Sequence, residues 1–392
     1  MKILQVLDTF YPNVDGPVNV IVNIAKICNE KGWADVELLV PKYPKNHEIE
    51  GLTIHRSKSM KSAEGYRMSV PFFDKKMKKL FKQGGYDAIH VHSPFTLGKY
   101  AVKWAKKMNI PVAMTVHTKY KSDFERKLKS KALQKFMMNF IMKPINNSDY
   151  VLSVSNGASE TLREYGCTHK DIFVIRNGTD MKPVEIDEKL KEEIRAKYNL
   201  QNKFTFLFVG RIVENKNVQF SLKVLNLLKQ KYGKDFVFVI VGEGNYVDEL
   251  KKIAVEYGLS DNLIFTGKIM DRKQLSAVYA CADLFLFPST FDTCGIVALE
   301  AAVNSLPSVM ICNSCASELV VNGQNGLALE ENAELWAEEI AKIMDSESTL
   351  QAMKDDVTKS LYIPWEKIVK EYVDFYQKMV DEKTENEKKQ NL

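Results

Sequence analysis

The stretch that decides the fold is FPSTFDTCGIVALEA, residues 287–301. It closes an apolar, strand-like run, passes through a polar turn and continues as an apolar run with helical spacing. Two carboxylates lie eight positions apart, Asp292 in the predicted turn and Glu300 inside the predicted helix. A buried strand, a polar turn and a helix are the repeating parts of a doubly wound α/β domain.

The same alternation recurs along the whole chain. Seven apolar, β-rich runs precede residue 180, at 2–10, 35–43, 52–57, 87–93, 111–118, 149–155 and 171–178. Five more follow, at 204–213, 236–244, 262–268, 283–289 and 308–312. Continuous apolar strands separated by helices predict parallel sheets covered on both faces. We therefore expect two doubly wound, Rossmann-like α/β domains whose strand ends face each other across a cleft.

Turn residues and a charged run near 177–190 mark the domain boundary. We expect an N-terminal domain at 1–180, completed by an amphipathic helix at 364–381, and a C-terminal domain at 181–363. The polar residues 382–392 are predicted to be disordered.

Composition narrows the class of protein. The chain has 392 residues, 45% hydrophobic and 27% charged, which suits a soluble two-domain protein. No apolar run approaches the roughly 20 residues that span a bilayer, and no signal peptide is evident, so we expect a cytoplasmic protein. Six cysteines make no disulfide framework, and the lone C-x-x-C at Cys312 and Cys315 has no second pair to complete a zinc site.

Glycine turns follow several of the predicted strands. In VGRIVENKN (209–217), Gly210 allows a tight turn, while Arg211 and Lys216 place two cations near a helix N-terminus, which favours anions. The alternative is a pair of solvated surface cations. VGEGNY (241–246) is compatible with a ligand loop or a plain turn, and so is NVDGPV (13–18), where Gly16 could bring a backbone N–H close to a phosphate.

Histidines mark two other strand ends. We expect His90 and His92 to face opposite sides of their strand, a poor arrangement for a metal. His117 ends an apolar strand and could bind a ligand hydroxyl or be a satisfied structural histidine. The chain contains no D-x-D sequence, so the acidic clamp that commonly holds a metal on a nucleotide diphosphate is missing. We expect no metal site and no cofactor.

Asp292 and Glu300 could contact different parts of one long ligand. If a helix starts near Gly295, its first N–H groups can meet an anion or hydroxyls. A molecule with a sugar at one end and a ribose at the other would explain the spacing. A loop Asp and a helix Glu without any ligand role remain the alternative.

Taken together, these motifs resemble glycosyltransferase family 4, the retaining, nucleotide-sugar-dependent enzymes of GT-B fold. The resemblance runs from the Gly16 loop through His117-Thr118, Asn177–Asp180, the GR…K motif and VGEG to the acidic pair. The family has a glutamate where this chain has Asp292, and T-C-G replaces the G-F-G of many members. The resemblance implies a metal-independent hexosyltransferase that uses a UDP- or GDP-sugar and binds no nucleic acid. The rivals would be a binding module, a phosphorylase or an epimerase of the same architecture.

The resemblance also assigns roles to individual residues. The catalytic group would comprise His117, Asp292, Arg211 and Lys216, with His117 at the sugar and the two cations at the diphosphate. Donor binding would add backbone or side-chain contacts from Gly16, Gly210, Gly242, Glu243, Thr293, Cys294, Gly295, Ile296, Val297 and Glu300, with Glu300 on the ribose.

The acceptor is indicated by charge and by a finer resemblance to the branch that glycosylates diacylglycerol. Residues 1–150 hold 26 Lys and Arg against 13 Asp and Glu, although the whole chain has a net charge of only +5. The basic segments are 75–82 and 119–144, the second with apolar residues at near-helical spacing, as expected for a helix on an anionic membrane.

The predicted membrane residues are Lys75, Lys76, Lys78, Lys79, Lys121, Arg126, Lys127, Lys129 and Lys131. An ordinary helix with its apolar face in the core is the alternative, as is transfer to a polyprenyl-linked or soluble glycan. With a lipid acceptor, the enzyme would be attached peripherally to the inner face of the membrane.

Overall fold

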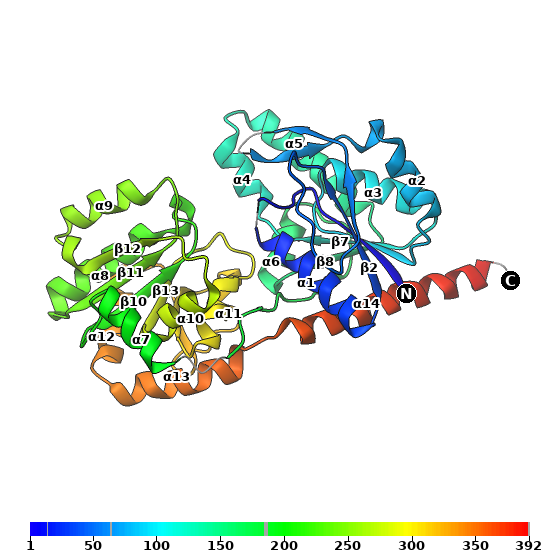
Figure 1. Cartoon of the computed structure of the whole chain (residues 1–392). Helices are drawn as coiled ribbons and strands as arrows, with labels where there is room; N and C mark the ends of the chain where they lie inside the picture. Colours follow the sequence, from blue (N-terminus) through cyan, green and yellow to red (C-terminus); the bar gives the residue numbers. More distant parts are fainter. Residues whose placement is uncertain (14, 63–64, 184–186, 391–392) are drawn as a thin grey trace. The chain divides into compact units, whose positions relative to one another are not determined.

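The computed structural model describes residues 1–13, 15–62, 65–183 and 187–390. The chain forms two compact units, Met1–Gly178 with Trp365–Leu392 (unit 1) and Thr179–Pro364 (unit 2). Each unit is an α/β domain built on a parallel sheet, which confirms the predicted fold class (Figure 1).

Unit 1 contains a seven-stranded sheet in the order β3-β2-β1-β6-β7-β8-β9, in which all neighbours are parallel. A separate antiparallel pair, β4 with β5, lies outside this sheet. The strands are β1 (Lys2–Val6), β2 (Asp35–Pro41), β3 (Ile54–Ser57), β4 (Ser59–Lys61), β5 (Arg67–Ser69), β6 (Ala88–Val91), β7 (Val112–Val116), β8 (Tyr150–Ser153) and β9 (Ile172–Val174). The helices are α1 (Gly16–Lys31), η2 (Pro71–Phe73), α2 (Lys75–Gln83), α3 (Thr96–Lys107), α4 (Tyr120–Lys127), α5 (Lys131–Asn146), α6 (Asn156–Glu164) and α14 (Trp365–Gln390).

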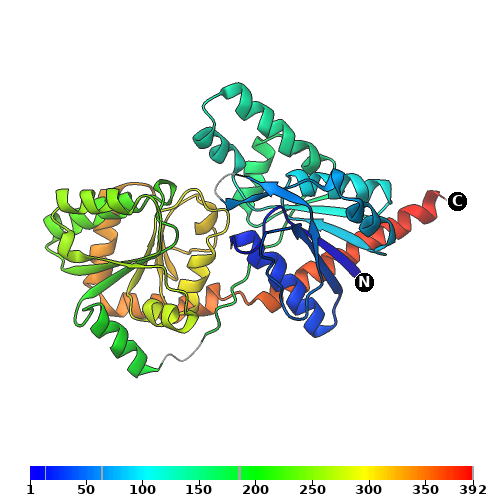
Figure 2. The ribbon, with the colours of Figure 1, turned by 45° about the horizontal axis from the view of Figure 1, so that its top comes forward.

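Helices cover the unit 1 sheet because its strands are apolar on both sides. Side chains of α2, α3 and α5 pack with alternate residues of β1, β6 and β7 into one core. The chain returns to this unit at α14, which packs against α1 and β6 (Figure 2). The tail predicted to be disordered was 382–392; residues 382–390 continue α14 instead, and 391–392 lie outside the described residues. Two ion pairs support this extension, Lys378–Glu382 and Lys383–Glu387, and in each of them the partners lie four residues apart on the helix.

Unit 2 contains a six-stranded parallel sheet in the order β12-β11-β10-β13-β14-β15. The strands are β10 (Phe204–Val209), β11 (Phe236–Val241), β12 (Leu263–Gly267), β13 (Leu284–Phe287), β14 (Ser308–Ile311) and β15 (Gly326–Leu329). The helices are α7 (Glu188–Lys197), η3 (Glu214–Lys216), α8 (Val218–Tyr232), α9 (Val247–Glu256), η4 (Ser260–Asn262), α10 (Arg272–Ala280), α11 (Ile296–Val303), η5 (Cys315–Ser317), α12 (Ala333–Met344) and α13 (Glu347–Leu361).

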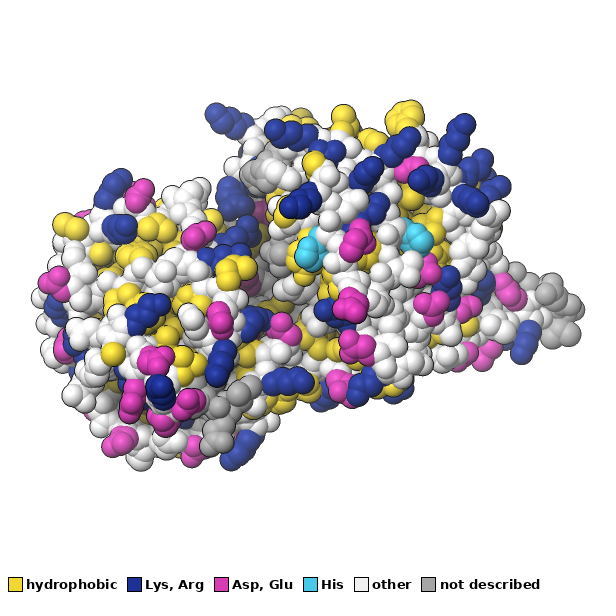
Figure 3. All heavy atoms as spheres, viewed as in Figure 1, with side chains coloured by type: hydrophobic (Ala, Val, Ile, Leu, Met, Phe, Trp, Pro, Cys, Tyr) yellow, Lys and Arg dark blue, Asp and Glu magenta, His cyan; other side chains and the backbone are white. Residues whose placement is uncertain are grey.

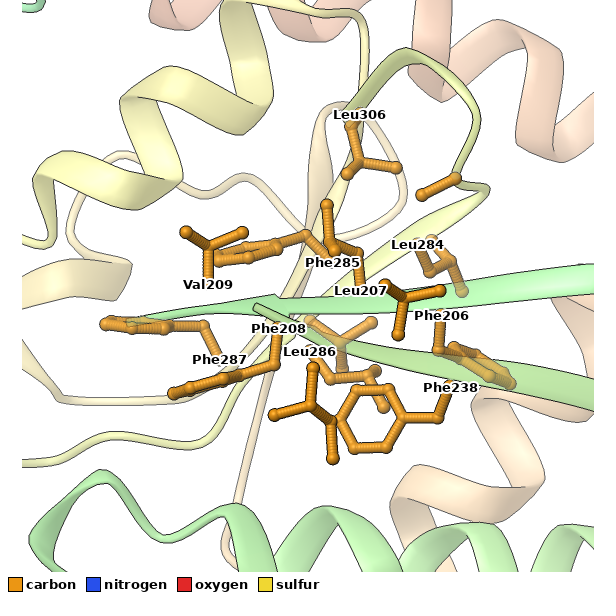
Figure 4. Close-up of a cluster of buried hydrophobic side chains, with 14 of the residues drawn as sticks. Phe206, Leu207, Phe208, Val209, Phe238, Leu284, Phe285, Leu286, Phe287 and Leu306 are labelled. Atoms are coloured by element: carbon orange, nitrogen blue, oxygen red, sulfur yellow. The ribbon is translucent and has the colours of Figure 1, made fainter. Parts of the chain in front are cut away.

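The centre of this sheet is a dense aromatic and aliphatic core. Phe206 and Phe208 of β10 pack with Phe285 and Phe287 of β13, and all four side chains are buried (Figure 4). The chain leaves β10 toward one edge of the sheet and leaves β13 toward the other edge. At such a switch point the two following loops diverge, and open α/β sheets bind their ligands there.

Candidate functional site

The loops after β10 and β11 are held together by backbone hydrogen bonds. The Gly210 N–H donates to the Val241 carbonyl at 3.0 Å, and the Ile212 N–H donates to the Glu243 carbonyl at 2.9 Å. Gly242 has φ +140°, and a Cβ on it would lie 1.9 Å from the Gly210 carbonyl oxygen. The fold itself therefore requires the glycines of VGEG, because only glycine lets the two loops approach this closely.

Lys216 and Asp292 form an ion pair between the loops after β10 and β13. The Lys216 ammonium lies 2.6 and 2.8 Å from the two Asp292 carboxylate oxygens. Ser289 donates a further hydrogen bond to the same carboxylate, and the side chains of Lys216 and Asp292 are only 14% and 21% exposed. The sequence placed Lys216 at a diphosphate and Asp292 at a sugar. The structure brings the two together at the switch point, whereas Arg211, directly after Gly210, is exposed.

The turn before α11 requires glycine. Gly295 has φ +66°, and a Cβ there would lie 2.8 Å from the Cβ of Ala316. The helix begins at Ile296, as the sequence indicated, and no side chain among the described residues caps this end. Backbone N–H groups at the start of a helix are suited to an anion. The other predicted contacts, Thr293, Cys294 and Val297, are partly buried around this turn.

Glu300 is buried and is held by two residues that the sequence analysis did not identify. Arg272 donates to one Glu300 oxygen at 2.8 Å, and the Tyr279 hydroxyl donates to the other at 3.1 Å. Arg272 also pairs with Asp180, the last residue of the N-G-T-D motif. Burial raises the pKa of Glu300, while Arg272 and Tyr279 favour its ionised form.

No local pattern distinguishes Arg272 from the many other surface cations. Arg272 is the first residue of α10, and Asp271 before it is an ordinary helix N-cap. The two carboxylates of the opening stretch thus differ: Asp292 is partly exposed with a lysine partner, and Glu300 is buried with an arginine partner. A ligand can meet two distinct polar groups from a single strand–turn–helix segment.

In unit 1, Gly16 lies in the segment after β1 and His117 directly after β7. Gly16 begins α1, and a Cβ on it would have no other atom within 4 Å. His117 follows β7 and is 8% exposed. Its Nε2 lies 2.9 Å from His92 Nδ1, and burial lowers the pKa of His117 to about 3.

The expectation that His90 and His92 face opposite sides of the sheet is wrong. Their rings lie 4.0 Å apart between centroids. Side chains alternate along a strand, so residues two apart return to the same face.

The predicted membrane residues are all exposed: Lys75, Lys76, Lys78 and Lys79 on α2, Lys121, Arg126 and Lys127 on α4, Lys129 between the helices and Lys131 on α5. The second basic segment is not one continuous helix, because the chain is extended at Leu128 and Ser130 caps a new helix. Figure 3 shows Lys and Arg side chains gathered over the part of unit 1 that carries α2 and α5, with apolar side chains between them.

Exposed apolar side chains accompany these cations. Leu133 and Phe136 on α5 are 44% and 62% exposed. Phe72 and Phe73 of η2 are 57% and 81% exposed, and Met60 and Met68 of the β4–β5 pair are about half exposed. We refer to Met60, Met68, Phe72, Phe73, Leu133 and Phe136, with the nine basic residues, as the basic-apolar surface.

Within 1–13, 15–62, 65–183 and 187–390, no three His, Cys, Asp or Glu side chains are grouped to hold a metal ion. None of the helices in this part of the chain has the length and apolar character needed to cross a membrane.

Comparison with known proteins places both units in the same class. Residues 14–182 match the family described as Glycosyltransferase Family 4, and residues 190–360 match Glycosyl transferases group 1. The alpha-monoglucosyldiacylglycerol synthase of Acholeplasma laidlawii is 27% identical over 356 residues, covering 86% of each chain. The UDP-Gal:alpha-D-GlcNAc-diphosphoundecaprenol alpha-1,3-galactosyltransferase of Escherichia coli is 30% identical over 264 residues, 65% of each chain.

Solved structures agree on the fold. HepE from Anabaena, solved in complex with UDP, superposes on 96% of this chain and 100% of its own with a TM-score of 0.77. The sequence identity is 17%, so this likeness concerns the fold.

Proposed function

The chain belongs to the glycosyltransferases of family 4, and from this premise we propose that it is a retaining hexosyltransferase that moves a sugar from a UDP- or GDP-hexose to a lipid hydroxyl. The membership confirms the resemblance inferred from the motifs, and the chain is a glycosyltransferase. Donor, acceptor and stereochemistry are our proposal.

The observation that carries the donor proposal is the pair of differently partnered carboxylates around the N-terminus of α11. Glu300, fixed by Arg272 and Tyr279, is suited to accept hydrogen bonds from a ribose diol. The diphosphate would meet Arg211, Lys216 and the first N–H groups of α11. HepE, which shares the fold, was solved with UDP.

The proposed reaction breaks the bond between the anomeric carbon and the diphosphate oxygen and forms a bond to the acceptor oxygen on the same face. The acceptor proton passes to an oxygen of the departing diphosphate. Arg211 and Lys216 stabilise the negative charge that develops on that group. Asp292 holds Lys216 in place and provides a polar contact for the sugar, without forming a covalent intermediate.

We propose that this chemistry needs no metal, because two cations and a helix N-terminus can balance the charge. Activity should therefore survive EDTA. Loss of activity in EDTA, restored by added magnesium, would contradict the metal-free part of the proposal.

The basic-apolar surface supports a lipid acceptor such as diacylglycerol. Each Lys or Arg near an anionic bilayer contributes about 1 kcal/mol, so a few of the nine would hold the protein reversibly. Exposed Phe73 and Phe136 could enter the interface between headgroups and acyl chains. The Acholeplasma relative is named for synthesis of a glucosyldiacylglycerol. The enzyme would act at the cytoplasmic face of the membrane.

The test combines donors, acceptors and membranes. The purified protein is incubated with UDP-glucose, UDP-galactose or GDP-mannose and with phosphatidylglycerol vesicles containing diacylglycerol. We expect an α-linked glycolipid by NMR and flotation of the protein with these vesicles, reduced by salt. Phe73→Ser should weaken flotation, whereas Met270→Ser, a control at another strongly exposed apolar residue, in unit 2, should not.

A second acceptor class is favoured by the Escherichia coli relative, whose name specifies a diphosphoundecaprenol acceptor. Transfer to a polyprenyl-linked or soluble glycan would serve polysaccharide synthesis. Glycosylation of such acceptors, with no flotation and no product from diacylglycerol, would replace the lipid proposal.

A further inference from the structure

Three side chains meet at the switch point of unit 2: Lys216, Asp292 and Ser289. Lys216 Nζ lies 2.6 Å from Asp292 Oδ1 and 2.8 Å from Oδ2, and the Ser289 hydroxyl is hydrogen-bonded to Oδ2. Ser289 is 0% exposed, so its hydroxyl is out of reach of a ligand. Any effect that Ser289 has on a ligand must therefore pass through the carboxylate.

The chemistry of the groups fixes the direction of each hydrogen bond. An ammonium only donates and a carboxylate only accepts, so the Ser289 hydroxyl must donate. Each carboxylate oxygen accepts about two hydrogen bonds. Oδ2 of Asp292, which accepts from Lys216 and Ser289, has no acceptor position left, whereas Oδ1 accepts from Lys216 and keeps one. Within the described residues no other donor reaches this carboxylate, and its side chain is 21% exposed, so a ligand can approach Oδ1.

The lysine is held at both ends. Asn217, the residue after Lys216, has φ +58° and donates from its side chain to Glu331 at 2.7 Å, which fixes the backbone. The Lys216 ammonium lies 5.7 Å from the centre of the buried Phe287 ring, within range of a cation–π contact. An ammonium has three N–H groups, so at least one remains for an acceptor other than Asp292.

We propose that Ser289 is a positioning residue that orients the Asp292 carboxylate toward Lys216, so that the ammonium meets the donor diphosphate and Asp292 binds a single hydroxyl of the donor sugar through Oδ1. Both ligand contacts rest on the function proposed above, whereas the effect of Ser289 on the ion pair does not. Asp292 cannot bind two neighbouring sugar hydroxyls with its two oxygens, because Oδ2 has no acceptor position left.

Glu300 differs from Asp292 in this respect. It accepts from Arg272 on one oxygen and from Tyr279 on the other, so each oxygen keeps one acceptor position. A carboxylate with one position on each oxygen can bind both hydroxyls of a diol. The two carboxylates of the segment 287–301 are therefore suited to different parts of a nucleotide sugar, a diol at Glu300 and one hydroxyl at Asp292.

The effect of Ser289 on the ion pair can be measured without a donor. The rate at which acetic anhydride acetylates Lys216, followed by mass spectrometry, reports how firmly Asp292 holds the ammonium. Ser289→Ala should raise this rate several-fold in the wild-type chain and leave it unchanged in the Asp292→Ala background. Ser221→Ala is the matched control, because Ser221 of α8 is also 0% exposed and its hydroxyl has no hydrogen-bond partner among the described residues.

An acetylation rate of Lys216 that is unchanged or lower in Ser289→Ala would overturn the positioning role, whether or not the protein transfers sugar. If Ser289→Ala does not fold, Ser289→Cys takes its place with the same expected direction, because a thiol donates more weakly than a hydroxyl.

The consequence for transfer is tested with the same variants. Ser289→Ala should lower kcat by about two- to tenfold, the effect of one hydrogen bond, with little change in the KM for the donor, because Lys216 acts on charge that develops in the transition state. In the Asp292→Ala background, Ser289→Ala should have no further effect. Equal losses in both backgrounds would show that Ser289 acts independently of Asp292 and would overturn the proposal.

Donors that lack one sugar hydroxyl each test the contact at Oδ1. One of these deoxy donors should be less sensitive to Asp292→Ala than the parent donor, and the others should be as sensitive as the parent. Reduced sensitivity for two of them would reveal a contact through both oxygens and overturn the single-hydroxyl contact, and reduced sensitivity for none would remove the sugar from Asp292. A protein that transfers no sugar at all would overturn the proposed function and both ligand contacts, while acetylation of Lys216 still decides the role of Ser289.

Discussion

Replacing Arg272 with alanine should destabilise the protein in a way that depends on pH. Arg272 donates to Glu300 at 2.8 Å, and the Glu300 side chain is only 8% exposed. Removing the arginine leaves a buried carboxylate with Tyr279 as its partner. A hydrogen bond to a charged group contributes about 1.5–3 kcal/mol. Because the Arg272 side chain is 49% exposed, water compensates part of the loss, and we expect a loss of about 1–2 kcal/mol in the free energy of unfolding.

The sign of the pH dependence follows from the pKa of Glu300. Burial already raises this pKa, and without Arg272 it should rise further. When Glu300 is protonated in both the wild type and the variant, Arg272 contributes little to the free energy of unfolding. As pH rises through the Glu300 pKa of the wild type toward the higher pKa of the variant, the difference in stability should grow and then become constant.

Urea unfolding followed by tryptophan fluorescence, at several pH values, measures this difference. Lys273→Ala removes a neighbouring exposed cation of α10 and serves as the control. Glu300→Gln should remove the pH dependence, and the Arg272→Ala/Glu300→Gln double variant should be less destabilised than the sum of the two single variants. Additive effects, or a stability difference that does not change with pH, would refute the reasoning.

Three other predictions test the site and its support. Gly16→Ala should leave the melting temperature unchanged because a Cβ there meets no atom within 4 Å, but it should lower turnover if a phosphate approaches this backbone. Gly242→Ala should lower both the melting temperature and turnover. Lys216→Met should reduce kcat/KM by at least about a hundredfold with a normal circular dichroism spectrum, and activity close to that of the wild type would remove Lys216 from the site. Burial lowers the pKa of His90 and His117 to about 3. The free energy of unfolding should therefore fall as pH decreases below about 6.5, by about 1.4 kcal/mol per pH unit for each histidine. A free energy of unfolding that is constant between pH 7 and pH 5 would contradict the burial of these histidines in the neutral form.

The sequence alone determined the architecture and the chemical class. All seven strands of the unit 1 sheet and five of the six in unit 2 correspond to apolar runs, because a strand buried on both faces must be continuously apolar. The strand that the apolar runs did not predict is Gly326–Leu329, which is short and begins with a glycine. The β4–β5 pair was also not predicted, because its residues are too polar to resemble a buried strand. The glycine turns, the helix start at Ile296 and the two carboxylates follow from local residue patterns, so the motifs were sufficient to identify the family.

Tertiary structure decided which side chains are partners. Arg272 approaches Glu300 from a different helix, and Asp180 joins them from the segment before α7. Lys216 meets Asp292 across 76 residues of sequence, and Tyr376 meets Gln5 across 371. No periodicity in the sequence encodes such pairs, because they arise where parallel strands end side by side and where a late helix packs onto the first strand. Whether Asp292 is paired and whether Glu300 is buried are therefore properties of the folded chain.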